Sequence, residues 1–340
     1  MGAMNNSQGL YFVGPRQLEL RDESTPTLEP KQVRVHTKYS GISAGTEMLL
    51  YRGEAPEQMA ADETLSALSG YLAYPLKYGY AAVGDVVELG AGVADDWLGQ
   101  TVFVFNPHER EFVANVDELY KLPAGLAPEL GVLLPTVETA LNFLHDGRPV
   151  AGEDVVVIGQ GVVGQLTTAL LGRMPLNSLI TLDRLAVRRE MSCKMGATQS
   201  LDPAQPEYIA PHLGQADLCY ELSGSPTALN QAIAMTGFSG RVVIGSWYGT
   251  KTAPLDLGGR FHRSRIQLIS SQVSTLSPSL QSRWSKQRRM DFALKLLQTL
   301  KLDQLITHRI NFNHAADAYR LLDEQPDKAL QMVLSYEDTE

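Results

Sequence analysis

Residues 159–164 form a glycine-rich turn whose spacing suits it to hold a phosphate group. The turn reads Gly159-Gln160-Gly161-Val162-Val163-Gly164 and follows a short apolar segment, residues 154–158. The first glycine permits a tight turn, the second lets the backbone approach a pyrophosphate, and the third lets a helix pack closely on a strand. The amino end of the following helix offers unpaired N–H groups to the anion. Because the turn stands between a predicted strand and a predicted helix, it predicts a dinucleotide site.

A carboxylate stands where such a site binds a ribose. Asp183 ends the next predicted strand, residues 178–182, about 20 residues after the last glycine of the turn. A carboxylate at this position accepts hydrogen bonds from ribose hydroxyls and repels a 2′-phosphate, which favours NAD over NADP. Arg184 leaves NADP as the alternative, because its guanidinium could stack on adenine or reach toward a phosphate.

Polar residues also follow the later strands of the same region, where ligands of open α/β sheets bind. These candidates are Ser223, Gly224, Gly245, Ser246, Trp247, Ser271 and Gln272. Trp247 and its neighbour Tyr248 could also contact a substrate; otherwise they are core aromatics.

The elements that must position these residues change character near residue 150. Before it, apolar and polar residues alternate in short segments between glycines and prolines, which predicts a β-rich domain. After it, short apolar strands alternate with helices of about ten residues, which predicts a parallel sheet. The predicted strands of the second part are residues 154–158, 178–182, 217–221 and 241–244, and the predicted helices are residues 165–172, 186–195 and 226–235. From about residue 283 the pattern predicts two more helices, residues 290–300 and 313–322, and a last strand, residues 331–334.

Composition excludes several other classes of protein. The chain has 340 residues, 44% hydrophobic and 20% charged, which is ordinary for a globular protein of two domains. Its net charge of −9 disfavours a nucleic-acid partner, because phosphate binding requires the opposite sign. Two cysteines cannot form a disulfide scaffold and fit a reducing cytoplasm. The polar start of the chain and the lack of a long apolar run predict neither a secretory signal nor a membrane span.

Taken together, these motifs resemble the medium-chain dehydrogenase/reductase superfamily over nearly the whole chain. The matching segments are residues 38–43, 79–84, 86–90, 134–140, 159–164, 240–245, 305–309 and 315–322. Residues 40–47 are most similar to the zinc-type alcohol dehydrogenase-like branch, which includes bacteriochlorophyllide hydroxyethyl dehydrogenases.

The resemblance implies the architecture as well. A Rossmann doubly wound parallel sheet, residues 146–284, would be inserted in a β-rich GroES-like catalytic domain, residues 1–145 and 285–340. Substrate and nicotinamide would meet in a cleft, and the polar loops after the Rossmann strands would line the nicotinamide.

This chain departs from the zinc members of the branch at every ligand position. Where those members have a cysteine, the chain has Ser43, or Ala44 if the gap is drawn differently. Their histidine corresponds to Tyr80, and their third ligand falls near Leu134. The cysteine-rich lobe that holds a structural zinc is also missing, because residue 105 runs almost straight into residue 112. A catalytic zinc needs three protein ligands and an open position, so we predict no zinc.

Without a metal, side chains must stabilise the oxyanion that forms during hydride transfer and supply a proton. Tyr80 stands at the position of a ligand histidine, so its phenol could do this; otherwise it is an apolar wall residue. Ser43 and Thr46 could relay a proton or bind a substrate oxygen, or each could hydrogen-bond within its own turn. Glu47 could orient that relay or form a surface ion pair with Arg52.

Two further residues are candidates for the chemistry. His108 follows Pro107 near the expected cleft and could exchange a proton near neutral pH; otherwise it is a solvated loop histidine. Glu138 is unusual at the start of an apolar helix, where it could face the nicotinamide or cap the helix. The basic residues Arg283, Lys286, Arg288 and Arg289 predict a solvated helix face. Residues 53–74, with a predicted helix over 59–68, could form a flap over the cleft or a packed surface helix.

The prediction is a cytoplasmic, zinc-independent, NAD(P)-dependent oxidoreductase that interconverts an alcohol and a ketone or aldehyde. One alternative is an NAD(P)H-dependent quinone or enoyl (C=C) reductase. Another is a dinucleotide-binding protein without catalysis. The expected partners are a small alcohol or carbonyl substrate and a second copy of the chain, pairing through residues 265–269 across a two-fold axis, with neither nucleic acid nor membrane involved.

Overall fold

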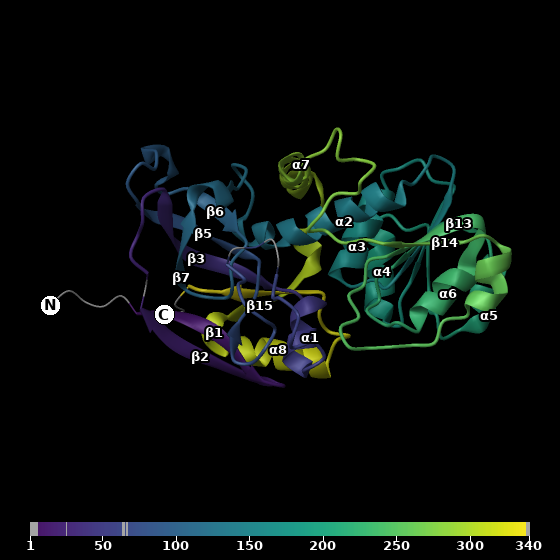
Figure 1. Cartoon of the computed structure of the whole chain (residues 1–340). Coiled ribbons are helices and arrows are strands. Elements are labelled where there is room, and N and C mark those ends of the chain that lie inside the picture. Colours follow the sequence, from purple (N-terminus) through teal and green to yellow (C-terminus); the bar gives the residue numbers. More distant parts are fainter. Residues whose placement is uncertain (1–5, 25, 63–64, 66, 338–340) are drawn as a thin grey trace. The chain divides into compact units, whose positions relative to one another are not determined.

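The computed structural model describes residues 6–24, 26–62, 65 and 67–337 (Figure 1). The first residues of the chain, on which the expectation of no secretory signal rests, lie outside this part. The chain divides into two compact units, residues 1–135 with 297–340 and residues 136–296. The Rossmann segment predicted over residues 146–284 lies within the second unit.

The first unit is built from two sheets. In the smaller, β1 (Asn6–Gly14) pairs antiparallel with β2 (Gln17–Ser24) and with β4 (Leu76–Lys77). The order of the larger is β15-β16-β3-β5-β6-β8, and β7 also pairs with β3. Its strands are β3 (Gln32–Ile42), β5 (Ala82–Leu89), β6 (Thr101–Val104), β7 (Glu111–Asn115), β8 (Tyr120–Lys121), β15 (Ile306–Asn311) and β16 (Gln331–Ser335). The expected β-rich domain is therefore confirmed.

Sequence-distant segments meet in this unit. β16, from the end of the chain, pairs antiparallel with β3, and α8 (Ala315–Glu324) contacts α1 (Thr46–Arg52). β3 alternates side chains across the sheet, so Val33 and Val35 enter a core with Val86, Val102 and Phe112. This core holds the first half of β3 in the sheet, and the polar residues discussed below begin at the other end of the strand, after Ile42.

The second unit is a six-stranded parallel sheet with the order β11-β10-β9-β12-β13-β14. In chain order from the first strand this is 3-2-1-4-5-6, the order of a Rossmann fold, so the predicted fold class is confirmed. The strands are β9 (Asp154–Ile158), β10 (Ser178–Leu182), β11 (Gln199–Leu201), β12 (Ala216–Glu221), β13 (Thr236–Ile244) and β14 (Gln267–Ser270).

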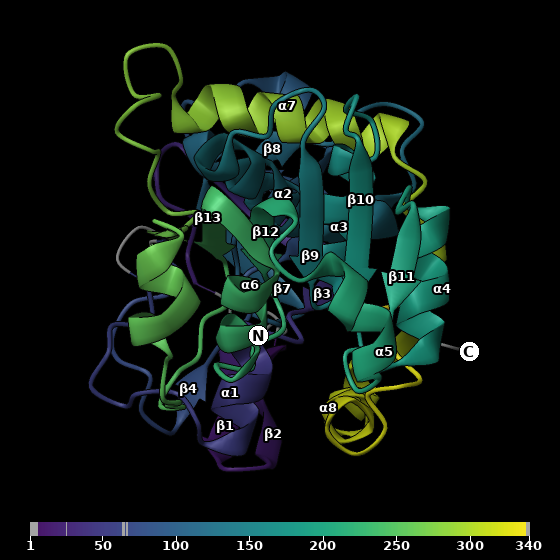
Figure 2. The ribbon, with the colours of Figure 1, turned by 90° about the vertical axis from the view of Figure 1, so that its right-hand side faces the viewer.

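Helices cover both faces of this sheet (Figure 2). Val155 and Val157 of β9 face a core that includes Phe143 of α2 (Leu134–Gly147) and Leu171 of α3 (Val162–Leu171). Val156 and Ile158 face the opposite core, which includes side chains of α6 (Ala228–Met235). The remaining helices are α4 (Ala186–Lys194), α5 (Pro206–Ile209) and α7 (Lys286–Thr299). Burial on both faces explains why the strands are continuously apolar in sequence.

Several sequence expectations were wrong in detail. The described residues between 59 and 68 contain no helix, and Ala60 forms an isolated β-bridge with Tyr71. Strands β1 and β2 were not predicted, because the apolar residues of β1 form only one short run and those of β2 are separated by charged residues. Arg289, expected on a solvated face, is fully buried. Among the described residues, no helix combines the length and apolar character that a membrane crossing requires.

Candidate coenzyme and hydroxyl sites

The glycine turn of the second unit has open space at Gly161 and is tightly packed at Gly159 and Gly164. Gly159 has φ +91°, and a Cβ there would lie 2.5 Å from Cα of Ser223. A Cβ at Gly164 would lie 2.0 Å from the carbonyl oxygen of Gly159, so helix and turn are in direct contact. At Gly161 a Cβ would meet no described atom within 4 Å. The backbone is therefore bare where a diphosphate would approach, and α3 begins at the next residue with no side-chain cap on its amino end.

The other residues of the turn hold it in place through buried contacts. The side chain of Gln160 is fully buried and accepts a hydrogen bond from Thr168. Val162 and Val163 form the first turn of α3, and Val163 packs on the core beneath the sheet. Helix α3 thus starts three residues before the predicted position, which brings its first N–H groups to the turn.

Asp183 is placed directly beside this turn. Its Oδ2 accepts from the amide of Gln160 at 2.7 Å, and its Oδ1 accepts from the amide of Leu185 at 2.8 Å. A carboxylate has about four acceptor positions, so one on each oxygen is left for ribose hydroxyls. Arg184, the next residue, is exposed. These residues fit the adenosine end of a dinucleotide.

The loops after β12 and β13 are linked by hydrogen bonds. The amide of Gly224 donates to Oγ of Ser246 at 2.9 Å, and the amide of Gly245 donates to the carbonyl of Glu221 at 3.0 Å. Gly224 has φ +70°, and no described atom would meet a Cβ there within 4 Å. Trp247 is half-buried, so the core alternative for it does not hold.

Glu221 was missed by the sequence reasoning although it is central to these loops. It is fully buried at the end of β12 and accepts from the amide of Ser223 at 2.8 Å, from the Ser223 hydroxyl and from Tyr248 at 2.5 Å. An acidic residue that ends an otherwise apolar strand was the signal that could have identified it.

Ser271 and Gln272, after β14, belong to a different polar cluster. Oγ of Ser271 donates to Asp146 at 2.5 Å and accepts from Asn142 at 3.0 Å. Gln272 is exposed and hydrogen-bonds Ser274. The Ser271 cluster continues into α2, on which Glu138 lies.

Glu138 pairs with a partner that neither sequence alternative named. The guanidinium of the buried Arg289 lies 2.8 Å from its carboxylate and also donates to Asn142 at 2.5 Å. Arg289 further donates to the carbonyls of Val273 and Thr275. Burial raises the pKa of Glu138 despite the nearby guanidinium. This network joins α2, α7 and the loop after β14.

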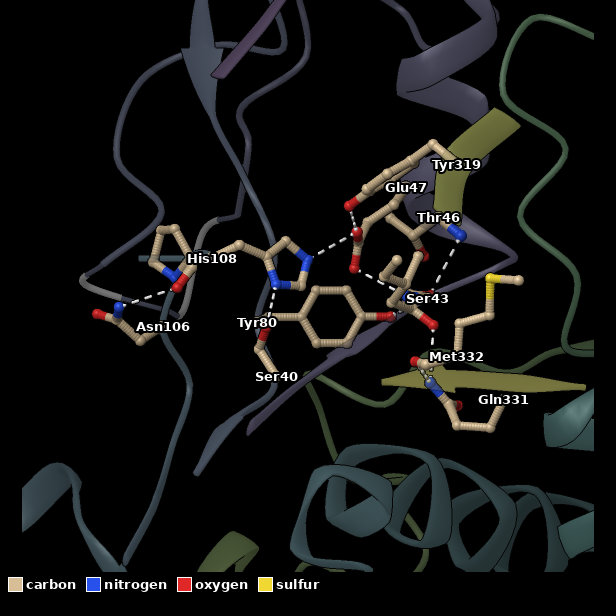
Figure 3. A network of polar contacts seen from close by, with 12 residues as sticks. Ser40, Ser43, Thr46, Glu47, Tyr80, Asn106, His108, Tyr319, Gln331 and Met332 are labelled. Atoms are coloured by element: carbon tan, nitrogen blue, oxygen red, sulfur yellow. Dashed lines mark hydrogen bonds and ion pairs between the residues drawn. The ribbon is translucent and has the colours of Figure 1, made fainter. Parts of the chain in front are cut away.

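In the first unit, the structure brings Ser43 and Tyr80 together. Ser43 directly follows β3, and Tyr80 lies between β4 and β5 (Figure 3). The Tyr80 hydroxyl donates to Oγ of Ser43 at 2.6 Å. The amide of Thr46, the first residue of α1, donates to the same oxygen at 3.4 Å. Burial raises the pKa of Tyr80, although the hydrogen bond to Ser43 opposes this effect.

Glu47 and His108 lie behind this hydroxyl pair and are both fully buried. Nε2 of His108 is 2.9 Å from Oε2 of Glu47, and the amide of Ser43 donates to Oε1 at 2.8 Å. The solvated alternative for His108 and the surface ion pair of Glu47 with Arg52 are therefore wrong, because Arg52 pairs with Asp323.

Two partners of this pair, and a third residue linked to it through one of them, were not foreseen. Tyr319 of α8 donates to Oε2 of Glu47, Oγ of Ser40 is 2.6 Å from Nδ1 of His108, and the Tyr336 hydroxyl is 2.8 Å from the same Ser40 oxygen. Their large sequence separations left no local pattern to detect.

The residues at the positions expected for zinc ligands do not suit the metal. Ser43 and Tyr80 hydrogen-bond each other, and Leu134 is fully buried and apolar. In the part of the chain that the structure describes, no three or more histidine, cysteine, aspartate or glutamate side chains are grouped to hold a metal ion. Neutral hydroxyls are poor zinc ligands compared with thiolate and imidazole.

Comparisons with known proteins agree with the fold. A family model described as zinc-binding dehydrogenase matches residues 162–290. D-guloside 3-dehydrogenase of Escherichia coli K12 is 23% identical over 96% of this chain and 99% of its own length. The 2-desacetyl-2-hydroxyethyl bacteriochlorophyllide A dehydrogenase of Rhodobacter capsulatus is 26% identical over 98% and 99%.

Solved structures share the whole architecture. A zinc-binding dehydrogenase of Sinorhizobium meliloti, solved with NADP, superposes with a TM-score of 0.78 at 18% identity and covers 97% of this chain and 99% of its own. The dehydrogenase rspB of Escherichia coli CFT073, solved with NADH, gives 0.78 at 20% identity with the same two coverages. At these identities the structures show the fold.

Proposed function

We propose that the chain is a member of the medium-chain dehydrogenase/reductase superfamily of alcohol dehydrogenase-like, NAD(P)-dependent oxidoreductases, to which its relatives are similar, and that it interconverts an alcohol and a ketone or aldehyde without zinc. The observation that carries this proposal is the hydrogen bond between Tyr80 and Ser43, at the positions where the resemblance places zinc ligands. Two hydroxyl groups there can serve the carbonyl oxygen that a metal would otherwise polarise.

Ser43 is the proposed hydroxyl that contacts the substrate. It accepts hydrogen bonds from Tyr80 and Thr46, so among its described contacts its own proton is left to donate. When bound, the coenzyme supplies the hydride. As the electron pair of the carbonyl bond moves to oxygen, Ser43 gives its proton to that oxygen and takes the proton of Tyr80. Water then returns a proton to Tyr80, and oxidation of the alcohol reverses these transfers.

The coenzyme would be held by the glycine turn, with Gly161 against the diphosphate and Asp183 on the adenosine ribose. Asp183 favours NAD, and NADP is the alternative through Arg184. We assign the nicotinamide half to the loops at Ser223, Gly224, Gly245, Ser246, Trp247, Ser271 and Gln272 as a proposal. The Glu221 contacts that hold the first two of these loops together support this assignment for Ser223 and Ser246.

Substitution of the two hydroxyl residues tests the proposal. Tyr80→Phe and Ser43→Ala should each lower kcat for carbonyl reduction by about 10²-fold or more, because each removes a member of the proton path. Coenzyme affinity, measured by fluorescence, should stay unchanged. Tyr11→Phe, in the sheet of β1 and β2, is the matched control and should keep wild-type kcat. Wild-type rates in both test variants would refute the assignment.

Deuterated coenzyme separates the two reaction classes. With ketones, aldehydes, enones and quinones as the panel, the proposed function predicts deuterium on the carbinol carbon. Deuterium on a carbon of a reduced C=C bond, or turnover of quinones alone, would establish the reductase alternative instead. Coenzyme binding without turnover of any panel member would establish the binding-protein alternative. One equivalent of zinc in purified protein would refute zinc independence.

The cellular setting is part of the proposal. A cytoplasmic enzyme fits the two free thiols, of which Cys193 is exposed and Cys219 buried. A homodimer would form through β14, which pairs with β13 on one side and ends the sheet order. Sedimentation at several concentrations tests this assembly.

A further inference from the structure

Glu47 and His108 form a buried pair next to the two hydroxyl residues, Ser43 and Tyr80. Both side chains are completely buried, and the carboxylate accepts from His108, from Tyr319 and from the amide of Ser43 (Figure 3). Removing a carboxylate from water is costly unless its oxygens are hydrogen-bonded, and these three donors offset that cost. A carboxylate that is held by three donors has a defined position. It therefore also fixes the position of the groups that bond to it.

One of those neighbours is Ser43. Oε1 of Glu47 binds the Ser43 amide at 2.8 Å, which closes the turn between β3 and α1. Because the amide and the hydroxyl belong to the same residue, the carboxylate fixes the backbone from which the hydroxyl projects. Without this bond the Ser43 backbone would keep, among its described contacts, only the hydrogen bond from the Glu47 amide to its carbonyl, so its position at the end of β3 would be less well defined.

The other neighbour is the segment that carries Tyr80. The His108 ring packs against Gly79, where a Cβ would lie 2.6 Å from Cδ2 of the ring. Gly79 has φ +120°, a conformation that side chains other than glycine rarely adopt. The ring thus contacts the backbone just before Tyr80 and determines the direction in which the Tyr80 side chain points.

The orientation of the ring is itself determined on its far side. Nδ1 of His108 lies 2.6 Å from Oγ of Ser40, which is bonded in turn to Tyr336 of the C-terminal segment. With Nε2–H donating to the carboxylate, Nδ1 accepts from Ser40 in the neutral ring and donates to it in the charged ring. Contacts at both ring nitrogens therefore fix the plane of the ring.

We infer that Glu47 and His108 are positioning residues, a buried carboxylate–imidazole pair that holds Ser43 from one side and Tyr80 from the other. This inference rests on the proposed function, because the pair positions the two hydroxyls assigned to proton transfer. Neither residue transfers the proton to substrate.

Kinetics of four variants test the inference. Glu47→Gln keeps an oxygen for the Ser43 amide, whereas Glu47→Leu removes it; His108→Gln keeps a donor to Glu47, whereas His108→Phe keeps only the ring. We expect kcat per equivalent of bound coenzyme to fall at least 10-fold in the Leu and Phe variants and less in the two Gln variants. The Michaelis constant for the carbonyl substrate should change less than threefold. The primary deuterium isotope effect should rise, since misplaced hydroxyls slow the chemical step.

Normalising to bound coenzyme counts the molecules whose second unit is folded, and the circular dichroism of each variant checks that the first unit is folded as well. Glu109→Gln is the matched control: this buried carboxylate, next to His108 in sequence, bonds Lys77 and Asn106 instead. It should leave normalised kcat and the isotope effect unchanged. Equal kcat in wild type and in the Leu and Phe variants would overturn the inference, as would an equal loss in Glu109→Gln.

A spectroscopic measurement separates this inference from the proposed function. In protein labelled with ¹⁵N-serine, the amide proton of Ser43, assigned by its absence in Ser43→Ala, should resonate downfield because it bonds a carboxylate. The resonance should move upfield in Glu47→Leu and His108→Phe but not in Glu109→Gln. If wild type turns over no substrate, the proposed function fails while this result still decides whether the pair fixes Ser43. An unmoved resonance would overturn the positioning role even in an active enzyme.

Discussion

Tyr80 sits in an environment that keeps its phenol protonated. Burial is the main cause of its raised pKa, and the negative charge of Glu47 acts in the same direction. A raised pKa extends the pH range in which the neutral hydroxyl can donate a proton. This is the form that carbonyl reduction consumes, whereas oxidation of an alcohol consumes the phenolate.

We therefore expect kcat for carbonyl reduction to stay level from about pH 7 to pH 10, the ordinary tyrosine pKa, and to fall only above it. The rate of alcohol oxidation should rise as the pH increases above about 10, where the reduction rate falls. A pH profile of both directions with one substrate pair checks this. An inflection in the reduction rate between pH 7 and 9 that persists in Tyr80→Phe would assign the proton to another group.

The sequence singled out Ser43 and Tyr80 as candidates because the resemblance aligns them with known ligand positions. It could not show that they bond each other. It also failed for the Glu47 pair, since His108 lies 61 residues and Tyr319 lies 272 residues away. A buried carboxylate and a solvated one look alike in sequence, and burial depends on segments that meet only in the folded chain.

At the level of elements, the turn between β9 and α3 was predictable because its constraints are local. Strand, glycines and helix follow one another within about twenty residues, and each glycine has its own steric reason. The position of Asp183 was predictable for the same reason, because it directly follows the end of β10. By contrast, β1 and β2 depend on pairing with each other and with β4, which no short pattern reveals.

Two alanine substitutions in this turn should affect different properties of the protein. Gly164→Ala forces a methyl group against the Gly159 carbonyl and should destabilise the protein by about 1–3 kcal/mol. Gly161→Ala meets open space and should leave stability unchanged while weakening NADH binding at least 10-fold. Thermal unfolding and coenzyme titration measure the two quantities. Normal NADH affinity in folded Gly161→Ala would contradict the placement of the diphosphate.

The buried guanidinium between α2 and α7 makes a second prediction for these elements. Arg289→Met leaves the Glu138 carboxylate buried and unpaired, so we expect a loss of about 3–5 kcal/mol in urea unfolding. The double variant Arg289→Met with Glu138→Leu should recover part of this loss, because the stranded charge is then absent. A double variant no more stable than the single one would show that the pair is not the main stabilising contact.

Arg289 is the member of the basic cluster for which the solvated-face prediction was wrong, whereas Arg283, Lys286 and Arg288 are exposed. Charges spaced along a helix usually indicate a solvated face, and Arg288 beside it is exposed. The acceptors that bury Arg289 come from α2 and from the loop after β14, more than ten residues away in each case.

For the whole molecule, buried phenols distributed over both units link stability to alkaline pH. Burial raises the pKa of Tyr78, Tyr220, Tyr319 and Tyr336 well above the ordinary value. Above about pH 10 the unfolded chain loses these protons while the folded chain retains them. The unfolded state then binds fewer protons, so the free energy of unfolding falls as pH rises.

We expect a cooperative alkaline transition in which phenolate absorbance and loss of far-ultraviolet circular dichroism coincide. In denaturant the same tyrosines should titrate together near pH 10. Ionisation of the full tyrosine content at an alkaline pH where the circular dichroism is still native would contradict the burial described here.

The first unit is discontinuous in the chain, and this has a consequence for how the protein is made. Ser40 and Tyr336 are 296 residues apart, so at the usual speed of a ribosome the earlier partner waits roughly 15–60 s for the later one. The uninterrupted second unit emerges complete during that interval. Nascent chains stalled before residue 319 should therefore already bind NADH, yet remain unable to reduce a carbonyl compound until the final segment has been translated.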